Sequence, residues 1–79
     1  MFSKLVMLAI QKHRRLLGEA IRATRKKAGF SQEKLAEKAC LSTVFISRIE
    51  RGVESPSVDN LVKIAKALGV RVGDLVAGF

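Results

Sequence analysis

Cysteine and histidine are scarce, with one residue of each type among 79. A single cysteine cannot form a disulfide within the chain, so nothing indicates an oxidising compartment and we expect a reducing cytoplasm. One histidine and one cysteine are also too few to complete a metal site without carboxylates. The sequence therefore predicts no disulfide, no bound metal and no cofactor.

Long hydrophobic runs are missing as well. The longest apolar run is Leu5-Val6-Met7-Leu8-Ala9-Ile10. A membrane-spanning helix needs about 20 apolar residues. A signal peptide needs a core of roughly 7–15 apolar residues and a cleavage site of small residues, which does not follow this run. We therefore expect neither a membrane segment nor a signal peptide.

Acidic residues are few: the chain has 7 Asp and Glu against 15 Lys and Arg, which gives a net charge of +8. The excess is local: residues 11–30 carry seven basic side chains and one acid, whereas residues 53–79 are neutral. Such a balance favours a polyanionic partner. It is equally compatible with a solvated basic face that keeps a small protein soluble, so charge alone does not decide between them.

The sequence also lacks the residue combinations that would form an active site. No paired carboxylates share an apolar stretch, no nucleophile stands near a base, and no glycine-rich phosphate loop follows a strand. A chain of 79 residues makes one domain and leaves no room for a second lobe with a cleft between the two. The sequence therefore predicts a protein that is not an enzyme and has no small-molecule substrate.

What the sequence does contain is helical spacing of its apolar residues almost throughout. Three glycines end apolar runs, as expected where a helix closes in a left-handed residue, and three serines open the next runs, where a hydroxyl can cap free amides. They are Gly29, Gly52 and Gly69, and Ser31, Ser42 and Ser57, with Pro56 marking a further break. This punctuation predicts a compact all-α domain of five helices, at about residues 12–28, 32–39, 43–51, 58–68 and 72–77.

Residues 1–11 precede this domain of residues 12–79 as an extension with apolar residues along one helical face. It is expected either to continue the first helix or to add contacts across a dimer. Two long helices are expected to enclose the short pair through apolar faces. These faces comprise Leu17, Ala20, Ile21, Thr24 and Ala28 in the first helix and Val58, Leu61, Val62, Ala65 and Leu68 in the fourth.

The most informative stretch is residues 32–51, two short helices joined by a tight turn. Cys40 lies in the turn, where a positive φ favours glycine. At about 100° per residue, Ile46 and Ile49 fall on the inner side of the second helix of this pair. The opposite arc carries hydroxyls, a small apolar side chain and two arginines but no acid: Thr43, Val44, Ser47, Arg48 and Arg51. Such a surface suits the major groove of DNA, where Arg can bond guanine and small apolar groups can pack on the thymine methyl.

These residues, with their neighbours, resemble the Xre/lambda-repressor type of helix-turn-helix family. The similarity rests on Ser31-Gln32-Glu33-Lys34-Leu35-Ala36, on Phe45-Ile46-Ser47-Arg48-Ile49-Glu50-Arg51-Gly52 and on Lys63-Ile64-Ala65-Lys66-Ala67-Leu68-Gly69-Val70. It extends over roughly residues 16–76. The resemblance implies a five-helix lambda-repressor-like domain, homodimeric binding to a palindromic operator in double-stranded DNA, and regulation of transcription.

The resemblance also implies roles for individual residues. Base contacts are expected from Thr43, Val44, Ser47 and Arg48, and phosphate contacts from Gln32, Ser42, Arg51 and Arg22. Arg25 and Glu50 match a structural ion pair between the first helix and the end of the recognition helix. Phe45 is interpreted as a packing residue and His13 as a surface side chain.

Two departures from the family pattern affect the expected DNA contacts. Glu54 lies in a loop that in many relatives faces the phosphate backbone, where an acid weakens binding or points elsewhere. No Gln or Asn occurs on the outward arc, so Arg48 becomes the main candidate for direct base discrimination.

The last predicted helix supplies the expected dimer interface. This short segment cannot bury all of its apolar residues within one chain, so part of the interface is expected there. These residues are Val72, Leu75, Val76 and Phe79. Two alternative functions share this fold: an antitoxin-type module that binds a toxin protein and represses its own operon, and a controller protein of a restriction-modification system. Only the short N-terminal extension offers a segment for an additional protein partner.

Overall fold

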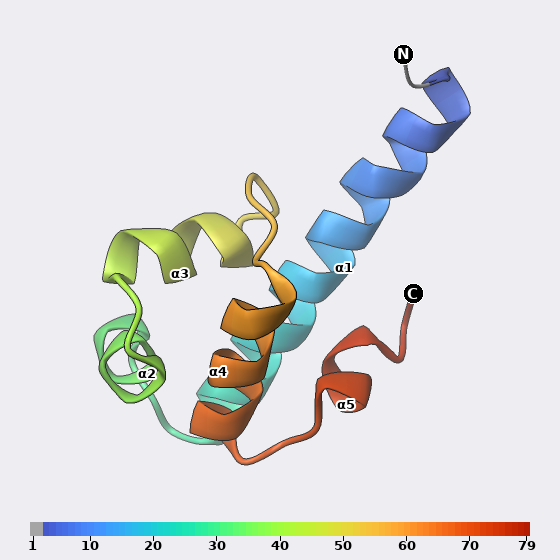
Figure 1. Ribbon diagram of the computed structural model, residues 1–79. Helices are drawn as coiled ribbons and strands as arrows, with labels where there is room; N and C mark the ends of the chain where they lie inside the picture. Colours follow the sequence, from blue (N-terminus) through green and yellow to red (C-terminus); the bar gives the residue numbers. More distant parts are fainter. Residues whose placement is uncertain (1–2) are drawn as a thin grey trace.

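The computed structural model describes residues 3–79, which form five helices joined by short loops (Figure 1). Met1 and Phe2, which belong to the predicted N-terminal extension, lie outside the described residues. The all-α prediction of five helices is confirmed. The helices are α1 (Lys4–Lys27), α2 (Gln32–Ala39), α3 (Thr43–Glu50), α4 (Val58–Leu68) and α5 (Val72–Val76).

The predicted serine caps begin α2, α3 and α4. The hydroxyl of Ser31 accepts from the Lys34 amide at 3.0 Å, and that of Ser42 accepts from the Phe45 amide at 3.0 Å. Ser57 makes the equivalent bond at the start of α4. Each bond satisfies a first-turn amide that has no partner within its helix.

The turn between α2 and α3 depends on a left-handed residue. Cys40 adopts φ 57° there, as its position in the sequence predicts, although a β-carbon makes this conformation less favourable than it is for glycine. The Leu41 amide then donates to the Ala36 carbonyl at 2.9 Å, which closes the end of α2. This turn sets the angle at which α3 leaves the body of the protein.

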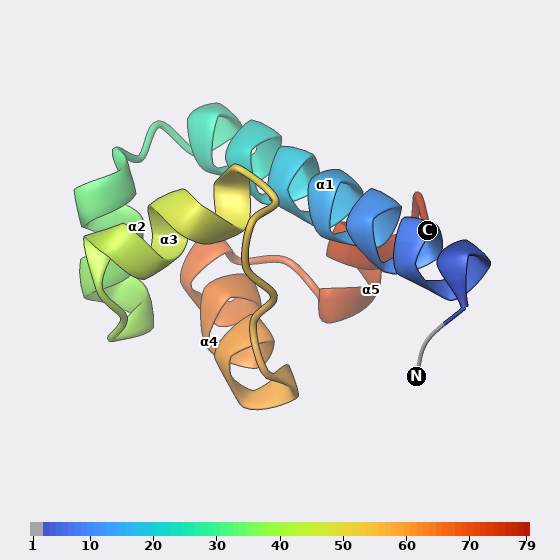
Figure 2. The same cartoon turned by 90° about the horizontal axis from the view of Figure 1, so that it is seen from above.

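Helix α1 is continuous from Lys4, so the extension continues the first helix. Ser3 caps it, with its hydroxyl accepting from the Val6 amide at 3.2 Å. The first turns project beyond the other helices, which we call the arm (residues 4–11; Figures 1 and 2). The molecule is correspondingly elongated, with extents of 38 × 23 × 20 Å. Within residues 3–79 no helix is long and apolar enough to cross a membrane.

The core lies where all five helices meet. Its largest fully buried side chains are Ile21, Leu35, Ile46, Ile49, Ile64 and Leu75. Helix α1 crosses α3 at Gly18, where a β-carbon would collide with the Ile49 carbonyl oxygen. Glycine is therefore required at this position to let the two backbones approach closely.

Ala28, placed on the buried face of the first helix by its spacing, is exposed at the end of α1. Two further expectations about buried faces are wrong. In α4, Val58 and Val62 are exposed, while Ile64 is fully buried and directs a different face of the helix inward. In α5, Leu75 is 2% exposed and belongs to the core of its own chain, so it cannot form the predicted dimer interface. Both errors have one cause: a short apolar pattern is compatible with neighbouring faces, and only packing against α1 and α2 selects one.

Candidate nucleic-acid interface

Helix α3 is anchored to the core by its back. Ile46 and Ile49 are 0% and 1% exposed, and Phe45 packs against the core at its edge, as interpreted from the sequence. The opposite side of the helix therefore faces solvent. We call this side the strip, and it comprises Thr43, Val44, Ser47, Arg48 and Arg51.

The strip is accessible and carries no acid. Val44 is 63% exposed, the Arg48 side chain is 55% exposed, and Arg51 is exposed at the end of the helix. Thr43 and Ser47 are half-buried between them. The strip thus offers hydroxyl groups, one methyl-bearing side chain and two guanidinium groups on a single helix face, which is the set of groups that base edges and phosphates bind.

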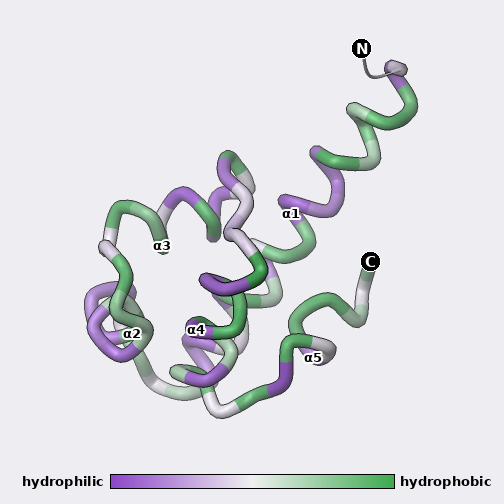
Figure 3. Tube along the Cα trace, viewed as in Figure 1, coloured by the Kyte–Doolittle hydropathy of each residue, from purple (hydrophilic) through white to green (hydrophobic). Residues whose placement is uncertain are grey.

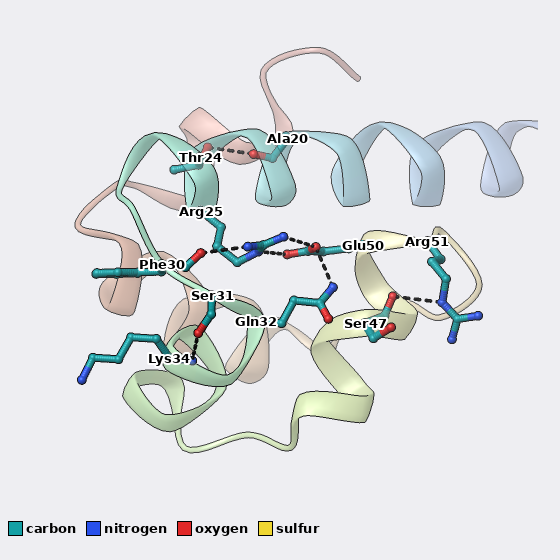
Figure 4. Close-up of polar contacts among 10 residues, drawn as sticks. All are labelled: Ala20, Thr24, Arg25, Phe30, Ser31, Gln32, Lys34, Ser47, Glu50 and Arg51. Atoms are coloured by element: carbon teal, nitrogen blue, oxygen red, sulfur yellow. Dashed lines mark hydrogen bonds and ion pairs between the residues drawn. The ribbon is translucent and has the colours of Figure 1, made fainter.

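A buried network holds α3 in place behind the strip (Figure 4). Arg25 on α1 donates to both carboxylate oxygens of Glu50, from Nε to Oε2 at 2.7 Å and from Nη2 to Oε1 at 3.0 Å. Its Nη1 donates to the Phe30 carbonyl at 2.8 Å. The ion pair that the family resemblance implies is therefore present, in bidentate form.

Burial strengthens this pair. The side chains of Arg25 and Glu50 are only 10% and 3% exposed. The hydrogen bond to Glu50 raises the pKa of Arg25 above its ordinary value, despite the opposing effect of desolvation. Among the described residues, no buried side-chain nitrogen or oxygen lacks a hydrogen-bond partner. The network therefore fixes α3 relative to α1 without leaving an unpaired charge.

Gln32 joins the same network from the first turn of α2. Its Nε2 donates to Glu50 Oε1 at 3.0 Å, and the residue is half-buried. The sequence predicts a phosphate contact here but gives no sign of this bond, because Gln32 and Glu50 are 18 positions apart. The backbone amide of Gln32 belongs to the first turn of α2, whose amides have no acceptor within the helix. Gln32 thus links the start of α2 to the end of α3.

An unexpected ion pair lies at the tip of the strip. Arg48 Nη1 is 3.5 Å from Glu54 Oε1, with side chains 55% and 37% exposed. The sequence shows Glu54 only as an acid in a loop that faces the phosphate backbone in many relatives. Its pairing with Arg48 cannot be predicted, because the path of a loop has no periodic sequence pattern. At this distance and exposure the pair is weak, so the guanidinium is readily exchanged to another acceptor.

The remaining predicted phosphate ligands fall into two groups. Ser42 is exposed at the start of α3, where it is also the helix cap, and the Nε of Arg51 donates to the Ser47 carbonyl at 3.4 Å. Ser42 lies at one end of the strip and Arg51 at the other. Arg22 is exposed on α1, so it belongs to the basic surface of that helix rather than to the strip.

The chain is similar to several known proteins. A family described as "Helix-turn-helix" matches residues 21–75. Control protein C.BamHI from Bacillus amyloliquefaciens is 48% identical over 64 residues, covering 80% of this chain and 79% of that protein. Some curated relatives are longer: the chain spans 42% of the immunity repressor protein of Bacillus phage phi105 and 38% of an HTH-type transcriptional regulator of Mycobacterium tuberculosis.

Solved structures share the fold over most of the chain. The crystal structure of the restriction-modification controller protein C.AhdI from Aeromonas hydrophila has a TM-score of 0.77 and 32% identity, over 78% of this chain and 94% of that one. The P22 c2 repressor, crystallised with a synthetic operator, has a TM-score of 0.74 and 38% identity, over 80% and 96% of the two chains. Both structures therefore share the overall fold of this chain.

Proposed function

The chain belongs to the helix-turn-helix family, and we propose that it is a transcriptional regulator that inserts α3 into the major groove of double-stranded DNA. The single observation that carries this proposal is the strip: an exposed, acid-free helix face whose back is fixed to the core by two buried isoleucines. An ordinary solvent-facing helix mixes acidic with basic residues. The net charge of +8 supports a polyanionic partner.

Within this proposal the strip residues divide by chemistry. Arg48 reads a guanine through its O6 and N7, and Val44 packs on a thymine methyl. Thr43 and Ser47 supply short hydroxyl contacts to base edges. Because these groups lie on a helix held by the Arg25–Glu50 pair, their spacing is set before DNA binds.

Phosphate contacts come from the rim of the same surface. Free amides at the starts of α2 and α3 favour an anion, and Gln32 and Ser42 lie at those two positions. Arg51 adds a cation at the far end of the strip, and Arg22 contributes through the basic surface of α1. These contacts set the position of the protein on the duplex and carry no sequence information.

The regulator acts as a homodimer on a palindromic operator. One strip covers only a few base pairs, so two copies placed about 34–36 Å apart on one side of the duplex provide the specificity that one lacks. The structure of a repressor with the same fold in complex with a synthetic operator supports binding to operator DNA. Access to DNA in turn supports the expected cytoplasmic location.

A second, narrower function is supported by two of the similar proteins. The similarity covers 79% of Control protein C.BamHI and 94% of the restriction-modification controller protein C.AhdI, at 48% and 32% identity. These two similarities support a role as the controller protein of a restriction-modification system. The test is a reporter fused to the DNA upstream of its gene, whose output should change when the protein is supplied and stay constant when the strip is altered.

Arg48→Ala tests the role of the strip directly. In binding to duplexes selected from a random pool, this variant should lose about 1–3 kcal/mol of discrimination at one base pair per half-site. Gln32→Ala should instead weaken binding to selected and random duplexes alike, since it removes a proposed phosphate contact and a hydrogen bond to Glu50 behind the strip, but no base contact. Lys63→Ala, on the exposed side of α4, removes the same charge away from the strip and should leave discrimination unchanged. Equal effects of Arg48→Ala on selected and random DNA would contradict the proposal.

A further inference from the structure

The arm exposes four consecutive large apolar side chains. Leu5, Val6, Met7 and Leu8 are 78%, 44%, 42% and 52% exposed, and Figure 3 shows this end of α1 as hydrophobic. At about 100° per residue these four side chains surround the helix instead of forming one stripe. A helix that is apolar all round is normally buried. The arm therefore has the composition of a core helix but projects into solvent.

A cleft with a mixed apolar and polar lining lies at the foot of the arm. It has a volume of about 200 Å³ and is lined by Ile10, His13, Arg14, Leu17, Ser55 and Phe79. The ring of Phe79 stacks on His13, with centroids 4.7 Å apart, yet Phe79 is still 53% exposed. Because Ile10 belongs to both the arm and the cleft lining, the apolar part of the cleft is continuous with the arm.

The exposed area matches the requirement of an interface. The chain exposes 5315 Å², whereas a compact monomer of 8.7 kDa exposes roughly 4,700 Å². The excess of roughly 600 Å² approaches the ~800 Å² that each partner contributes to a stable protein–protein interface. A partner that covers the arm and the cleft would bring the protein to the exposure expected for its mass.

We propose that the partner is a second copy of this chain, with each arm packed against the arm and the cleft of the other protomer. Two copies of a chain with net charge +8 repel each other over most of their surfaces, but residues 5–11 carry no charge and allow close approach. A two-fold axis would bury both arms and both clefts in one isologous contact.

This inference rests on the proposed function, because it locates the dimer that binding to two half-sites requires. It also replaces Leu75, which is buried within its own chain, by the arm as the main apolar contact. Of the four predicted interface residues, Phe79 is retained as part of the cleft, while Val72 and Val76 are half-buried against the core of their own chain.

The test is sedimentation equilibrium of the full chain and of the variant L5Q/L8Q. Glutamine removes apolar surface but keeps a helix propensity close to that of leucine, so the circular dichroism spectrum should stay the same. The dimer dissociation constant should rise roughly a hundredfold, because four leucines are altered in each dimer. The matched control is Val44→Gln, an exposed apolar residue on α3, which should leave dimerisation unchanged and weaken binding to selected DNA.

Three results would overturn the inference. They are a monomeric wild-type chain at all concentrations, an unchanged dimer in L5Q/L8Q, and binding of the wild-type chain, lost in L5Q/L8Q, to phosphatidylglycerol vesicles. Binding to a duplex with a single half-site separates this inference from the proposed function. If the arm is the dimer contact, L5Q/L8Q binds that duplex like the wild type. If the strip does not read DNA, Val44→Gln leaves DNA binding intact whatever the arm variant does.

Discussion

The two ion pairs of α3 differ in geometry, in exposure and in the distance along the chain between their partners. Arg25–Glu50 is bidentate, at 2.7 and 3.0 Å, and nearly inaccessible to solvent. Arg48–Glu54 has one long contact of 3.5 Å and is largely exposed. The first fixes the helix to the body, whereas the second only restrains a side chain that is free to find a better acceptor. A DNA-reading helix needs both: a rigid base, and a tip that exchanges partners when DNA arrives.

The largest effect is expected from breaking the buried pair. Glu50→Ala leaves the Arg25 guanidinium buried without its carboxylate, so the free energy of unfolding should fall by about 3–5 kcal/mol. Urea denaturation followed by circular dichroism measures this change. The matched variant Glu54→Ala breaks the exposed pair and should lower stability by less than about 1 kcal/mol. Equal losses in the two variants would show that burial does not distinguish these pairs.

A smaller effect is expected at Ser42, which lies between the two regions as both a helix cap and a proposed phosphate ligand. Ser42→Ala should lower the free energy of unfolding by about 1 kcal/mol, because the Phe45 amide loses its acceptor. Ser57→Ala removes the equivalent cap of α4 and should have a similar effect on stability. Fluorescence anisotropy with labelled duplex should then separate them, since only Ser42→Ala is expected to weaken DNA binding. Equal DNA affinity of both variants would restrict Ser42 to capping.

The smallest effect is expected from Glu54→Gln. This change releases Arg48 and removes a negative charge near the DNA, so binding to random duplexes should become a few times tighter while stability is almost unchanged. The slope of log affinity against log salt should steepen by about one unit, which titrations at several salt concentrations measure. Weaker binding by Glu54→Gln would instead mean that Glu54 orients Arg48 for its contact.

Much of the fold could be predicted because its local signals are strong. Serine caps and left-handed glycines define helix boundaries through hydrogen bonds within a few residues, and all the predicted caps are present. The orientation of α3 could be predicted for the same reason, since Ile46 and Ile49 define one face of a single helix. The sequence leaves open whether the N-terminal extension continues the first helix, and α1, capped by Ser3, shows that residues 4–11 do so.

What could not be predicted depends on contacts between distant segments. Leu75 lies in a helix of five residues, which is too short for its apolar pattern to tell a core from an interface. The Arg48–Glu54 pair depends on the path of the loop after α3, and the Gln32–Glu50 bond on the approach of α2 to α3. Sequence spacing alone gives no information on either.

The central claim, that the strip is the surface that enters DNA, is tested most directly by mapping amide chemical shifts of the labelled protein as duplex DNA is added. The account predicts the largest changes at residues 43–48 and at the first turn of α2, with small changes in the arm. Changes confined to α1, with residues 43–48 unaffected by bound DNA, would contradict it.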